Sequence, residues 1–300
     1  MPQLYRRLPA IVLASQLLAS TLAYSEPMTF KDYFALQGPA PTEHIPYGSA
    51  ASQFVELFEP NGQGPFPVVA IVHGGCWSTS LDGIKIMHNM AGDLVAHGIA
   101  VWNVEYRRLD EPGGGYPGTY LDINRAFDLL LERAPHYRLD TSRIVAMGHS
   151  AGGQLLQWLA GRANLPKTSP LYDRTPLHLR EIISLGGLAD LKDQKDRIKS
   201  VCSVDVSDLT GAPSATRPDP YRDTNAVALM PNGSHTVLIN GALDDISPPD
   251  VATAYANKAR GAGDHVETIV LPDASHFDEV AATSPAWKIT LPIILKALRK

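Results

Sequence analysis

The sequence predicts an α/β protein, with a mostly parallel, doubly wound sheet, helices on both faces and a cap insertion over residues 188–231. Two observations predict this fold class. Short apolar runs rich in Val and Ile, typical of buried strands, alternate with longer segments of helical periodicity. Polar or glycine-rich segments with reactive side chains directly follow several of these runs. Such alternation indicates parallel strands joined by helices, with chemistry beyond the carboxyl ends of the strands.

Length and composition are consistent with one enzyme domain. A chain of 300 residues with 44% hydrophobic content can bury one large core, so we expect a single domain over residues 26–300. The net charge is −5 and no run of Lys or Arg occurs, so nucleic acid is not an expected partner.

The amino terminus has the layout of a secretory signal peptide. Two arginines precede an apolar run over residues 8–23, and the small residues Ala23 and Ser25 then mark a cleavage site before Glu26. The run is short for a membrane span and no second one follows. We therefore expect residues 1–25 to be removed and the protein to be exported, to a periplasm or the medium, without stable membrane insertion. An uncleaved anchor is the alternative.

The two cysteines, Cys76 and Cys202, leave their redox state open. An exported chain could join them in a disulfide. Cys76 lies in a loop with another expected role, so the favoured interpretation is a pair of free, buried thiols. The ten histidines are scattered and no Cys/His cluster has metal-ligand spacing, so neither a metal nor a cofactor is expected.

The first elements come after a polar, Pro-rich leader over residues 26–52. Residues 54–58 (FVELF) alternate in polarity and predict a strand with one buried face. Residues 68–72 (VVAIV) are continuously apolar, which is typical of a central strand covered on both faces. Residues 86–97 then carry an apolar helical face, and Gly98 ends that helix.

The next elements lead to a glycine-rich turn. Residues 99–104 (IAVWNV) predict another buried strand, and residues 120–133 carry apolar side chains at helical spacing. Residues 143–146 (RIVA) form a short strand before the turn, and residues 154–160 (QLLQWLA) continue as a helix after it.

The region after this helix is harder to interpret. Residues 181–186 predict a further short strand. Residues 188–231 show only fragments of helix among mixed charges and prolines, so we interpret them as a cap over the carboxyl ends of the strands. A surface loop without function is the alternative.

The last part of the chain returns to regular alternation. Residues 236–240 predict a strand, residues 251–260 a helix, and residues 266–271 the final strand. Apolar residues at helical spacing over residues 291–298 predict a closing helix.

The glycine-rich turn holds a candidate nucleophile, Ser150. It is the centre of the pattern G-x-S-x-G, which here runs from Gly148 to Gly152 between a strand and a helix. A serine in this context forms a nucleophile elbow, in which the sharp turn exposes the hydroxyl above a helix amino terminus. The glycines are needed because larger side chains would collide with the neighbouring strand and helix.

A serine hydroxyl needs a base and an orienting carboxylate, and later strand ends provide both. His276 follows the final predicted strand and is the best base. Asp244 follows the preceding strand and is the favoured acid, although the adjacent Asp245 could serve instead and Asp273 is a distant third. His149 would point away from the serine that it flanks.

The segment after residues 68–72 is a candidate oxyanion hole. It reads His73-Gly74-Gly75-Cys76-Trp77, and the backbone N–H groups of Gly75 and Cys76, with that of Ala151, would converge on a carbonyl oxygen. His73 is expected to brace this loop. Trp77 could line the acyl pocket or pack the loop. The Tyr-Arg-Arg segment over residues 106–108 is expected to tie the loop to neighbouring carboxylates.

These motifs resemble the α/β-hydrolase superfamily, from about residue 54 to the end. The segments over residues 73–77, 105–107 and 148–153 look like its esterase/lipase branch, which includes kynurenine-formamidase-like, feruloyl-esterase-like and hormone-sensitive-lipase-like enzymes. The resemblance implies a Ser-Asp-His triad at Ser150, Asp244 and His276. Where the hormone-sensitive-lipase-like loop has a third glycine, this chain has Cys76.

The function expected from these residues is an exported serine hydrolase that cleaves small-molecule carboxylic esters through an acyl-enzyme. Three alternatives remain: an amidase such as an arylformamidase, a small serine peptidase, and a non-catalytic binding protein with this fold. The cap lacks a recognisable motif, so the substrate is left open.

Overall fold

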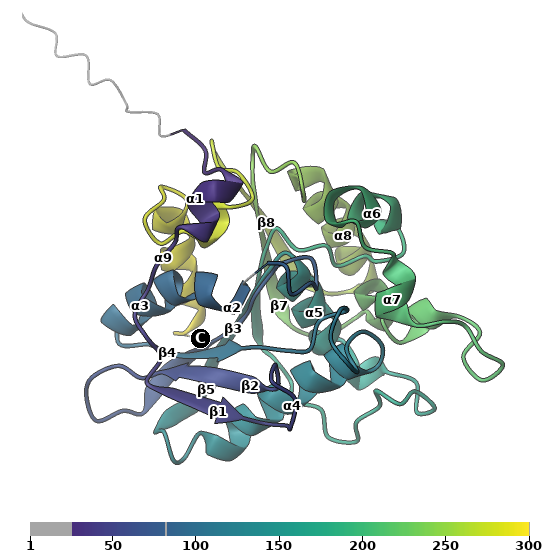
Figure 1. The fold of residues 1–300 in the computed structure, drawn as a ribbon, viewed down its shortest axis with the longest axis horizontal. Helices are drawn as coiled ribbons and strands as arrows, with labels where there is room; N and C mark the ends of the chain where they lie inside the picture. The colour runs from purple at the N-terminus through teal and green to yellow at the C-terminus, as the bar shows by residue number, and fades with distance from the viewer. Residues whose placement is uncertain (1–25, 82, 300) are drawn as a thin grey trace, which may run out of the picture.

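The computed structural model describes residues 26–81 and 83–299, in which one sheet carries the fold (Figure 1). The predicted signal peptide over residues 1–25 lies outside the described residues. The strands of the sheet are β1 (Glu43–Pro46), β2 (Phe54–Phe58), β3 (Phe66–Val72), β4 (Ala100–Val104), β5 (Leu139–His149), β6 (Glu181–Leu185), β7 (His235–Gly241) and β8 (His265–Leu271).

The strand order is β1-β2-β4-β3-β5-β6-β7-β8. Strands β3 to β8 pair in parallel, and β2 pairs antiparallel with both of its neighbours. Because parallel strands end at the same edge, the loops that follow β3, β5, β7 and β8 meet there. This order brings to one edge the ends of β3 and β8, Val72 and Leu271, which are 199 positions apart in the sequence.

Helices cover both faces of the sheet (Figure 1). Alternate side chains of β3 separate the two cores: Val68, Ala70 and Val72 pack toward α4 and α5, whereas Val69 and Ile71 pack toward α3 and α9. The described helices of four residues or more are α1 (Phe30–Phe34), α2 (Gly83–Ile86), α3 (His88–Ala96), α4 (Gly118–Arg133), α5 (Ala151–Ala160), α6 (Lys195–Cys202), α7 (Val206–Thr210), α8 (Pro249–Ala262), α9 (Trp287–Ala297) and the 3-10 helix η3 (Ala226–Leu229).

The predicted fold class is confirmed, and two elements were missed. The polar stretch over residues 26–52 contains α1 and the edge strand β1, where only a leader was expected. Both are short: α1 depends on a capping box made by Thr29 and Asp32, and β1 buries only Ile45. The helix predicted over residues 86–97 is divided into α2 and α3 at Met87.

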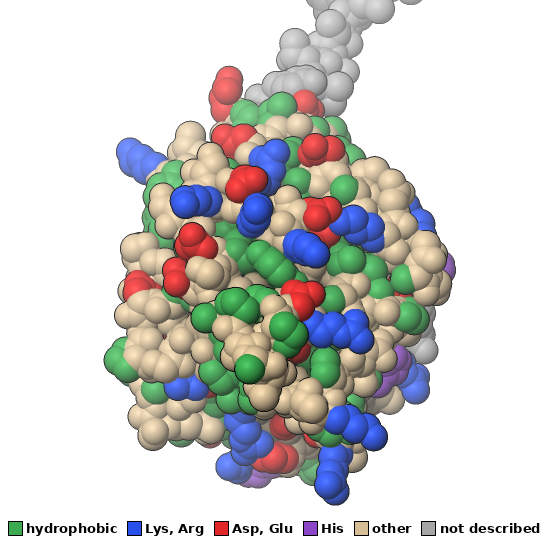
Figure 2. All heavy atoms as spheres, turned by 90° about the vertical axis from the view of Figure 1, so that its right-hand side faces the viewer, with side chains coloured by type: hydrophobic (Ala, Val, Ile, Leu, Met, Phe, Trp, Pro, Cys, Tyr) green, Lys and Arg blue, Asp and Glu red, His purple; other side chains and the backbone are tan. Residues whose placement is uncertain are grey.

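The segment over residues 188–231 contains α6, α7 and the short 3-10 helices η2 (Pro220–Arg222) and η3. Hydrogen bonds join the two ends of this segment, because Asn225 accepts the N–H of Leu191 and donates to Asp190. Figure 2 views the molecule from the right-hand side of Figure 1, where α6 and α7 lie, and shows acidic and basic side chains interspersed on this face.

Within the described part of the chain, no helix combines the length and the apolar character that crossing a membrane requires.

Candidate active site

Ser150 lies in the turn between β5 and α5, in a backbone conformation that non-glycine residues seldom adopt. Its φ is 51° and its ψ is −118°, and its N–H donates to the carbonyl of Leu185 at 2.8 Å. Dihedrals of this kind cost free energy and persist only where the surroundings hold them. Here the last five residues of β5 and all of α5 are buried, and they fix the turn from either side.

Close packing explains the glycines around Ser150. A Cβ on Gly152 would lie 2.1 Å from the carbonyl oxygen of Val72, and one on Gly148 would lie 2.5 Å from that of Gly152. These contacts involve backbone atoms, which cannot move aside as a flexible side chain could. The collision expected from the sequence is therefore present on both sides of the serine.

His276 and Asp244 are hydrogen-bonded to each other at the same edge of the sheet. The distance between His276 Nδ1 and Asp244 Oδ2 is 2.7 Å, and both residues are buried. Asp244 Oδ1 accepts the N–H groups of Ile246 and Ser247, each at 2.8 Å. Burial alone would raise the pKa of Asp244, but His276 and these two N–H groups hold it below its usual value.

The other aspartates considered from the sequence lie elsewhere. Asp245 is exposed, and its backbone carbonyl accepts Arg197 Nη1 at 3.3 Å. Asp273 is also exposed, in a turn where its φ is 55°. Of the three candidates, Asp244 is the one that contacts His276.

Ser150 and His276 line one pocket of about 360 Å³. In the described ranges, residues 26–81 and 83–299, no hydrogen bond joins Ser150 Oγ to His276 in this conformation. Such contacts are often long or misaligned until a ligand is bound. The apolar part of the pocket wall consists of Phe30, Tyr33, Leu81, Val201, Ile246 and Phe277, and its polar side chains include Ser78, Ser80, Ser203 and His149.

The helix α1, missed in the sequence, forms part of this wall. Phe30 packs its ring edge-on against Phe277, with 5.6 Å between ring centroids, and Tyr33 lies 5.2 Å from the same ring. Figure 1 shows α1 next to the C-terminal part of the chain. The aromatic spacing of residues 30–34 was the available signal, but five residues are too few for a periodicity argument.

The loop after β3 has the open backbone expected of an oxyanion hole. Gly75, Cys76 and Trp77 have φ values of 110°, 50° and 52°. The N–H groups of Gly75, Cys76 and Ala151 donate no hydrogen bond within the described part of the chain, so they are available to an external acceptor. Trp77 is fully buried in the core and is not among the pocket's lining residues, so it packs the loop.

Two residues brace this loop against the end of β4. His73 Nε2 is hydrogen-bonded to Glu105 Oε1 at 2.8 Å, and the ring of Tyr106 stacks on that of His73 with 4.6 Å between centroids. Burial would raise the pKa of Glu105, but the neighbouring His73 lowers it below its usual value. The bracing role expected of His73 is confirmed by these contacts.

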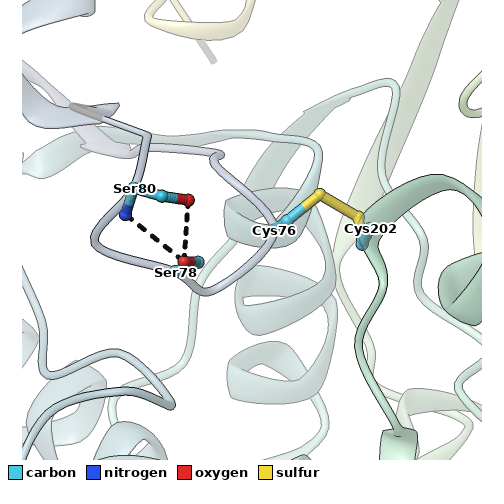
Figure 3. The surroundings of a disulfide bond; sticks show 4 residues. All are labelled: Cys76, Ser78, Ser80 and Cys202. Atoms are coloured by element: carbon cyan, nitrogen blue, oxygen red, sulfur yellow. Dashed lines mark hydrogen bonds between the residues drawn. A yellow bond between two sulfur atoms is a disulfide. The ribbon is translucent and has the colours of Figure 1, made fainter.

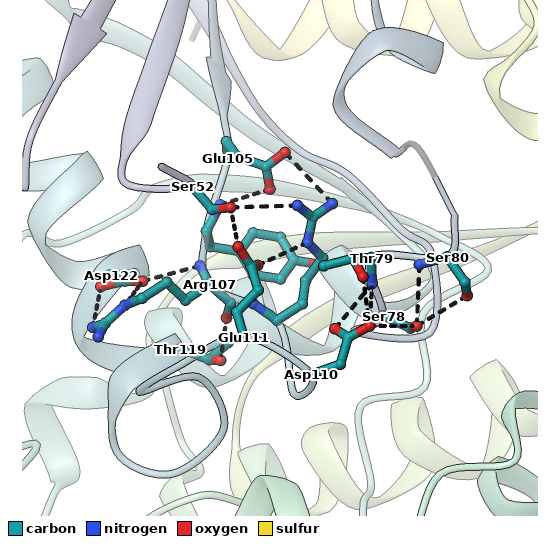
Figure 4. A network of polar contacts seen from close by, with 12 residues as sticks. Ser52, Ser78, Thr79, Ser80, Glu105, Arg107, Asp110, Glu111, Thr119 and Asp122 are labelled. Atoms are coloured by element: carbon teal, nitrogen blue, oxygen red, sulfur yellow. Dashed lines mark hydrogen bonds and ion pairs between the residues drawn. The ribbon is translucent and has the colours of Figure 1, made fainter. Parts of the chain in front are cut away.

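The loop after β4 is itself held by a network of carboxylates (Figure 4). Arg107 makes a two-pronged contact with Asp122, with both N···O distances at 2.8 Å, and Arg108 contacts Glu111 at 3.1 Å. Asp110 accepts the backbone N–H of Thr79 in the neighbouring loop at 3.0 Å. The structural role predicted for both arginines is confirmed.

The expectation of free thiols is wrong, because Cys76 and Cys202 form a disulfide (Figure 3). Their Cα atoms are 5.4 Å apart although 126 positions separate them in the sequence. The bond joins the loop after β3 to the last residue of α6. Val201, Cys202 and Ser203 also line the pocket, so this end of α6 lies at the site. Sequence reasoning could not find the pairing, because nothing in the pattern placed α6 beside that loop.

His149 supports the backbone of His276 rather than a ligand. Its Nε2 lies 3.1 Å from the carbonyl oxygen of His276, and the two rings are 4.4 Å apart. Burial, together with the neighbouring His276, lowers the pKa of His149 well below its usual value, so this ring is neutral. A neutral ring with a proton on Nε2 donates to that carbonyl.

Among residues 26–81 and 83–299, two groups of His and Glu side chains lie close enough together to be considered for a metal, His149–His276–Glu279 and His235–His265–Glu267. In the first, ring nitrogens of both histidines are already engaged with Asp244 and with a backbone carbonyl. In the second, His235 bridges two carboxylates, at 2.6 Å to Glu181 and 3.1 Å to Glu267. Neither group points to a metal centre.

The mostly parallel sheet, with a serine in a nucleophile elbow and a His–Asp pair at the following strand ends, defines an α/β-hydrolase fold. Residues 56–259 match the model of the BD-FAE family, which is more than half of the chain, and the chain belongs to this α/β-hydrolase esterase family.

Curated relatives and a solved structure are similar to this chain over part or most of its length. "Probable isoprenylcysteine alpha-carbonyl methylesterase ICMEL1" of Arabidopsis thaliana is 25% identical over 82% of the chain, and "Esterase EstD" of Thermotoga maritima is 29% identical over 45%. The chain spans 53% and 35% of the lengths of these two relatives. Esterase B from Lactobacillus rhamnosis has the same fold, with a TM-score of 0.73, 18% identity and 89% coverage of both chains.

Proposed function

We propose that this protein is a serine hydrolase that cleaves carboxylic ester bonds through Ser150, His276 and Asp244. The observation that carries the proposal is the 2.7 Å hydrogen bond between His276 and Asp244, at a pocket that Ser150 also lines. This bond fixes the imidazole tautomer, leaving Nε2 free to accept a proton from the serine. Membership of an esterase family supports the same reaction.

In the first half of the reaction, Ser150 Oγ attacks the ester carbonyl carbon and His276 Nε2 takes the hydroxyl proton. The carbonyl oxygen becomes an oxyanion, which accepts the N–H groups of Gly75, Cys76 and Ala151. Donors of this kind contribute about 3 kcal/mol each in the transition state. His276 then gives its proton to the departing alcohol, and the acyl group remains on Ser150.

In the second half, a water molecule attacks the acyl-enzyme while His276 takes its proton. The same N–H groups hold the oxyanion, and collapse of this intermediate releases the carboxylic acid. His276 returns the proton to Ser150 Oγ. Asp244 stays ionised throughout and stabilises the imidazolium that forms in each half.

The pocket favours a small ester with an apolar acyl or alcohol group. Its volume of about 360 Å³ is at the small end of ligand sites, and aromatic and aliphatic side chains such as Phe30, Val201 and Phe277 contribute to its wall. We propose that residues 188–231 act as a cap that shapes this pocket. The contribution of Val201, Cys202 and Ser203 to the lining supports this role.

We also propose that the protein is exported and that residues 1–25 are a cleaved signal peptide. The Cys76–Cys202 disulfide supports export, because such bonds persist mainly in oxidising compartments. Amino-terminal sequencing of protein recovered from outside the cytoplasm would test this, with a start at Glu26 as the expected result. Retention of the apolar run would contradict it.

Hydrolysis of p-nitrophenyl acetate and butyrate by the purified protein tests the reaction, with Ser150→Ala as the inactive control. Labelling by a fluorophosphonate at Ser150 provides a check that is independent of substrate. A panel of esters graded by acyl length, with feruloyl esters and N-formylkynurenine included, would then define the specificity. Unchanged ester hydrolysis by Ser150→Ala would overturn the proposal.

A further inference from the structure

One buried carboxyl group at the site has no part in the reaction above. Glu279 lies in the 3-10 helix η4 (Asp278–Val280), three residues after His276, and its side chain is completely buried. Carboxylates are seldom buried without a partner, because removing the charge from water is strongly unfavourable.

Among the residues that the structure describes, a donor reaches just one oxygen of Glu279. Oε1 accepts the N–H of Gly241 at 2.7 Å, whereas Oε2 accepts no hydrogen bond within the described part of the chain. His149 Nε2 is 4.0 Å from Oε2, but that nitrogen is already engaged with the carbonyl of His276. An ionised Glu279 would therefore leave a charged oxygen unsatisfied in the interior.

The groups around Glu279 in the described ranges do not supply a positive charge to balance it. Asp244, from the loop after β7, lies within hydrogen-bonding reach, and Asp278 is its neighbour in η4. His149, from the end of β5, is neutral, and His276 is hydrogen-bonded to Asp244. Burial and the charge of Asp244 raise the pKa of Glu279 well above its usual value.

We propose that Glu279 is a protonated carboxylic acid whose Oε2–H donates to the carboxylate of Asp244, and that it is a positioning residue for the His276–Asp244 pair. The proton resolves two problems at once, because it removes the unsatisfied charge and gives the orphan oxygen a partner. The positioning role rests on the proposed function, whereas the protonation of Glu279 is independent of it.

The consequence for the site is a further donor to Asp244. Ile246 and Ser247 donate to Oδ1, and His276 donates to Oδ2. The Oε2–H of protonated Glu279 adds a further donor to Asp244, and it comes from a third segment, η4. Asp244 is then held ionised and aimed at His276 by contacts from three segments, which keeps the imidazole in the tautomer that the serine needs.

The protonation of Glu279 can be tested without any activity measurement. A carboxyl whose pKa is higher in the folded than in the unfolded state contributes stability that is fully present below the unfolded pKa and is lost as pH rises toward the folded one. The unfolding equilibrium constant of the wild type should therefore rise relative to that of Glu279→Gln by about tenfold per pH unit above about pH 5. Urea unfolding from about pH 5 to about pH 8 measures this.

A matched control is Glu56→Gln, which changes a buried carboxyl on β2 that already accepts from His88 and Asn103. In Glu56→Gln, the unfolding equilibrium constant should still rise with pH as it does in the wild type. Parallel stability curves for the wild type and Glu279→Gln would overturn the proposal, since they would mean that Glu279 takes up no extra proton on folding.

The positioning role is tested by comparing Glu279→Gln with Glu279→Met. Glutamine keeps a donor for Asp244 and an acceptor for Gly241, whereas methionine has similar length but neither group. We expect kcat for ester hydrolysis to fall roughly ten- to hundredfold in Glu279→Met, with KM little changed, and glutamine to recover most of that loss. Equal kcat in Glu279→Met and the wild type, in protein shown to be folded by circular dichroism, would overturn the role.

The failure of this inference can be told apart from failure of the proposed function. A wild type that hydrolyses no ester and resists fluorophosphonate would refute the proposed function, while the unfolding curves would still decide whether Glu279 holds a proton.

Discussion

Cys76, in the loop after β3, is covalently bonded to Cys202, the last residue of α6. The backbone N–H of Cys76 is one of the proposed oxyanion donors, and Cys202 lines the same pocket. The bond therefore ties the loop that would hold the oxyanion to a wall of the pocket. His73 and Glu105 hold the other side of that loop by a 2.8 Å hydrogen bond.

Loss of the disulfide is expected to destabilise the protein. Cys202→Ser should lower the free energy of unfolding by about 2–5 kcal/mol, because the bond closes a long loop in the unfolded chain. Urea unfolding with and without a reductant measures this. The reductant should destabilise the wild type and have no effect on Cys202→Ser. A wild type that is equally stable in both conditions would contradict the prediction.

The two adjacent aspartates should respond very differently to the same change. Asp244→Asn is expected to lower kcat by about 10⁴, since an amide favours the wrong tautomer of His276. Asp245→Asn is the matched control and should have kcat within a fewfold of the wild type, because Asp245 is exposed. Steady-state kinetics on p-nitrophenyl butyrate compares them, and similar losses in both variants would disprove the assignment.

Acid should destabilise the fold through two carboxylates of the site. The pKa values of Asp244 and Glu105 are both lowered in the folded protein. A group with a depressed folded pKa contributes stability that is present above its unfolded pKa, and it is lost as pH falls through the folded pKa. We therefore expect unfolding free energy to decrease below about pH 4.5.

The control for this pH effect is Glu105→Gln, which cannot ionise. Its stability should fall less steeply with acid than that of the wild type, in urea titrations from about pH 5 to about pH 3. The stability curves of the wild type and Glu105→Gln should converge at low pH, where Glu105 is protonated in the folded and the unfolded protein. If the unfolding free energy of Glu105→Gln fell more steeply with acid than that of the wild type, the predicted direction of the pH effect would be wrong.

Two glycines in helices provide a test of the elbow packing. Gly152→Ala should destabilise the protein by several kcal/mol or prevent folding, because its Cβ would lie 2.1 Å from a backbone oxygen. Gly261→Ala, in α8, has open space around its Cβ and should stabilise the protein by about 0.5–1 kcal/mol. Thermal unfolding of both variants measures these effects. A Gly152→Ala variant as stable as the wild type would contradict the close packing around Gly152.

Local patterns predicted most of the regular elements. The runs over residues 54–58 and 68–72 form β2 and most of β3, and the segment over residues 120–133 lies within α4. These elements bury most of their apolar faces, so their periodicity is strong. By contrast, α1 has five residues and β1 has four, which is too short for a clear periodicity. In addition, α1 packs against Phe277, which is distant in sequence.

The sequence by itself predicted the candidate reactive groups and their order along the strand ends. Ser150, Asp244 and His276 could be named because a parallel sheet brings the carboxyl ends of its strands together, whatever the details of packing. The motif around Ser150 also specified its strained turn, since only glycines avoid collision with the neighbouring backbone.

Only the tertiary structure decided which distant groups meet at that edge. It chose Asp244 over the adjacent Asp245, joined Cys76 to Cys202, and placed Glu279 beside Asp244. These relationships depend on distances between segments 32 to 126 positions apart, and no local periodicity encodes such distances. The physical reason is that pairing and burial are properties of the packed chain, whereas residue patterns report only on the nearest few turns or strand positions.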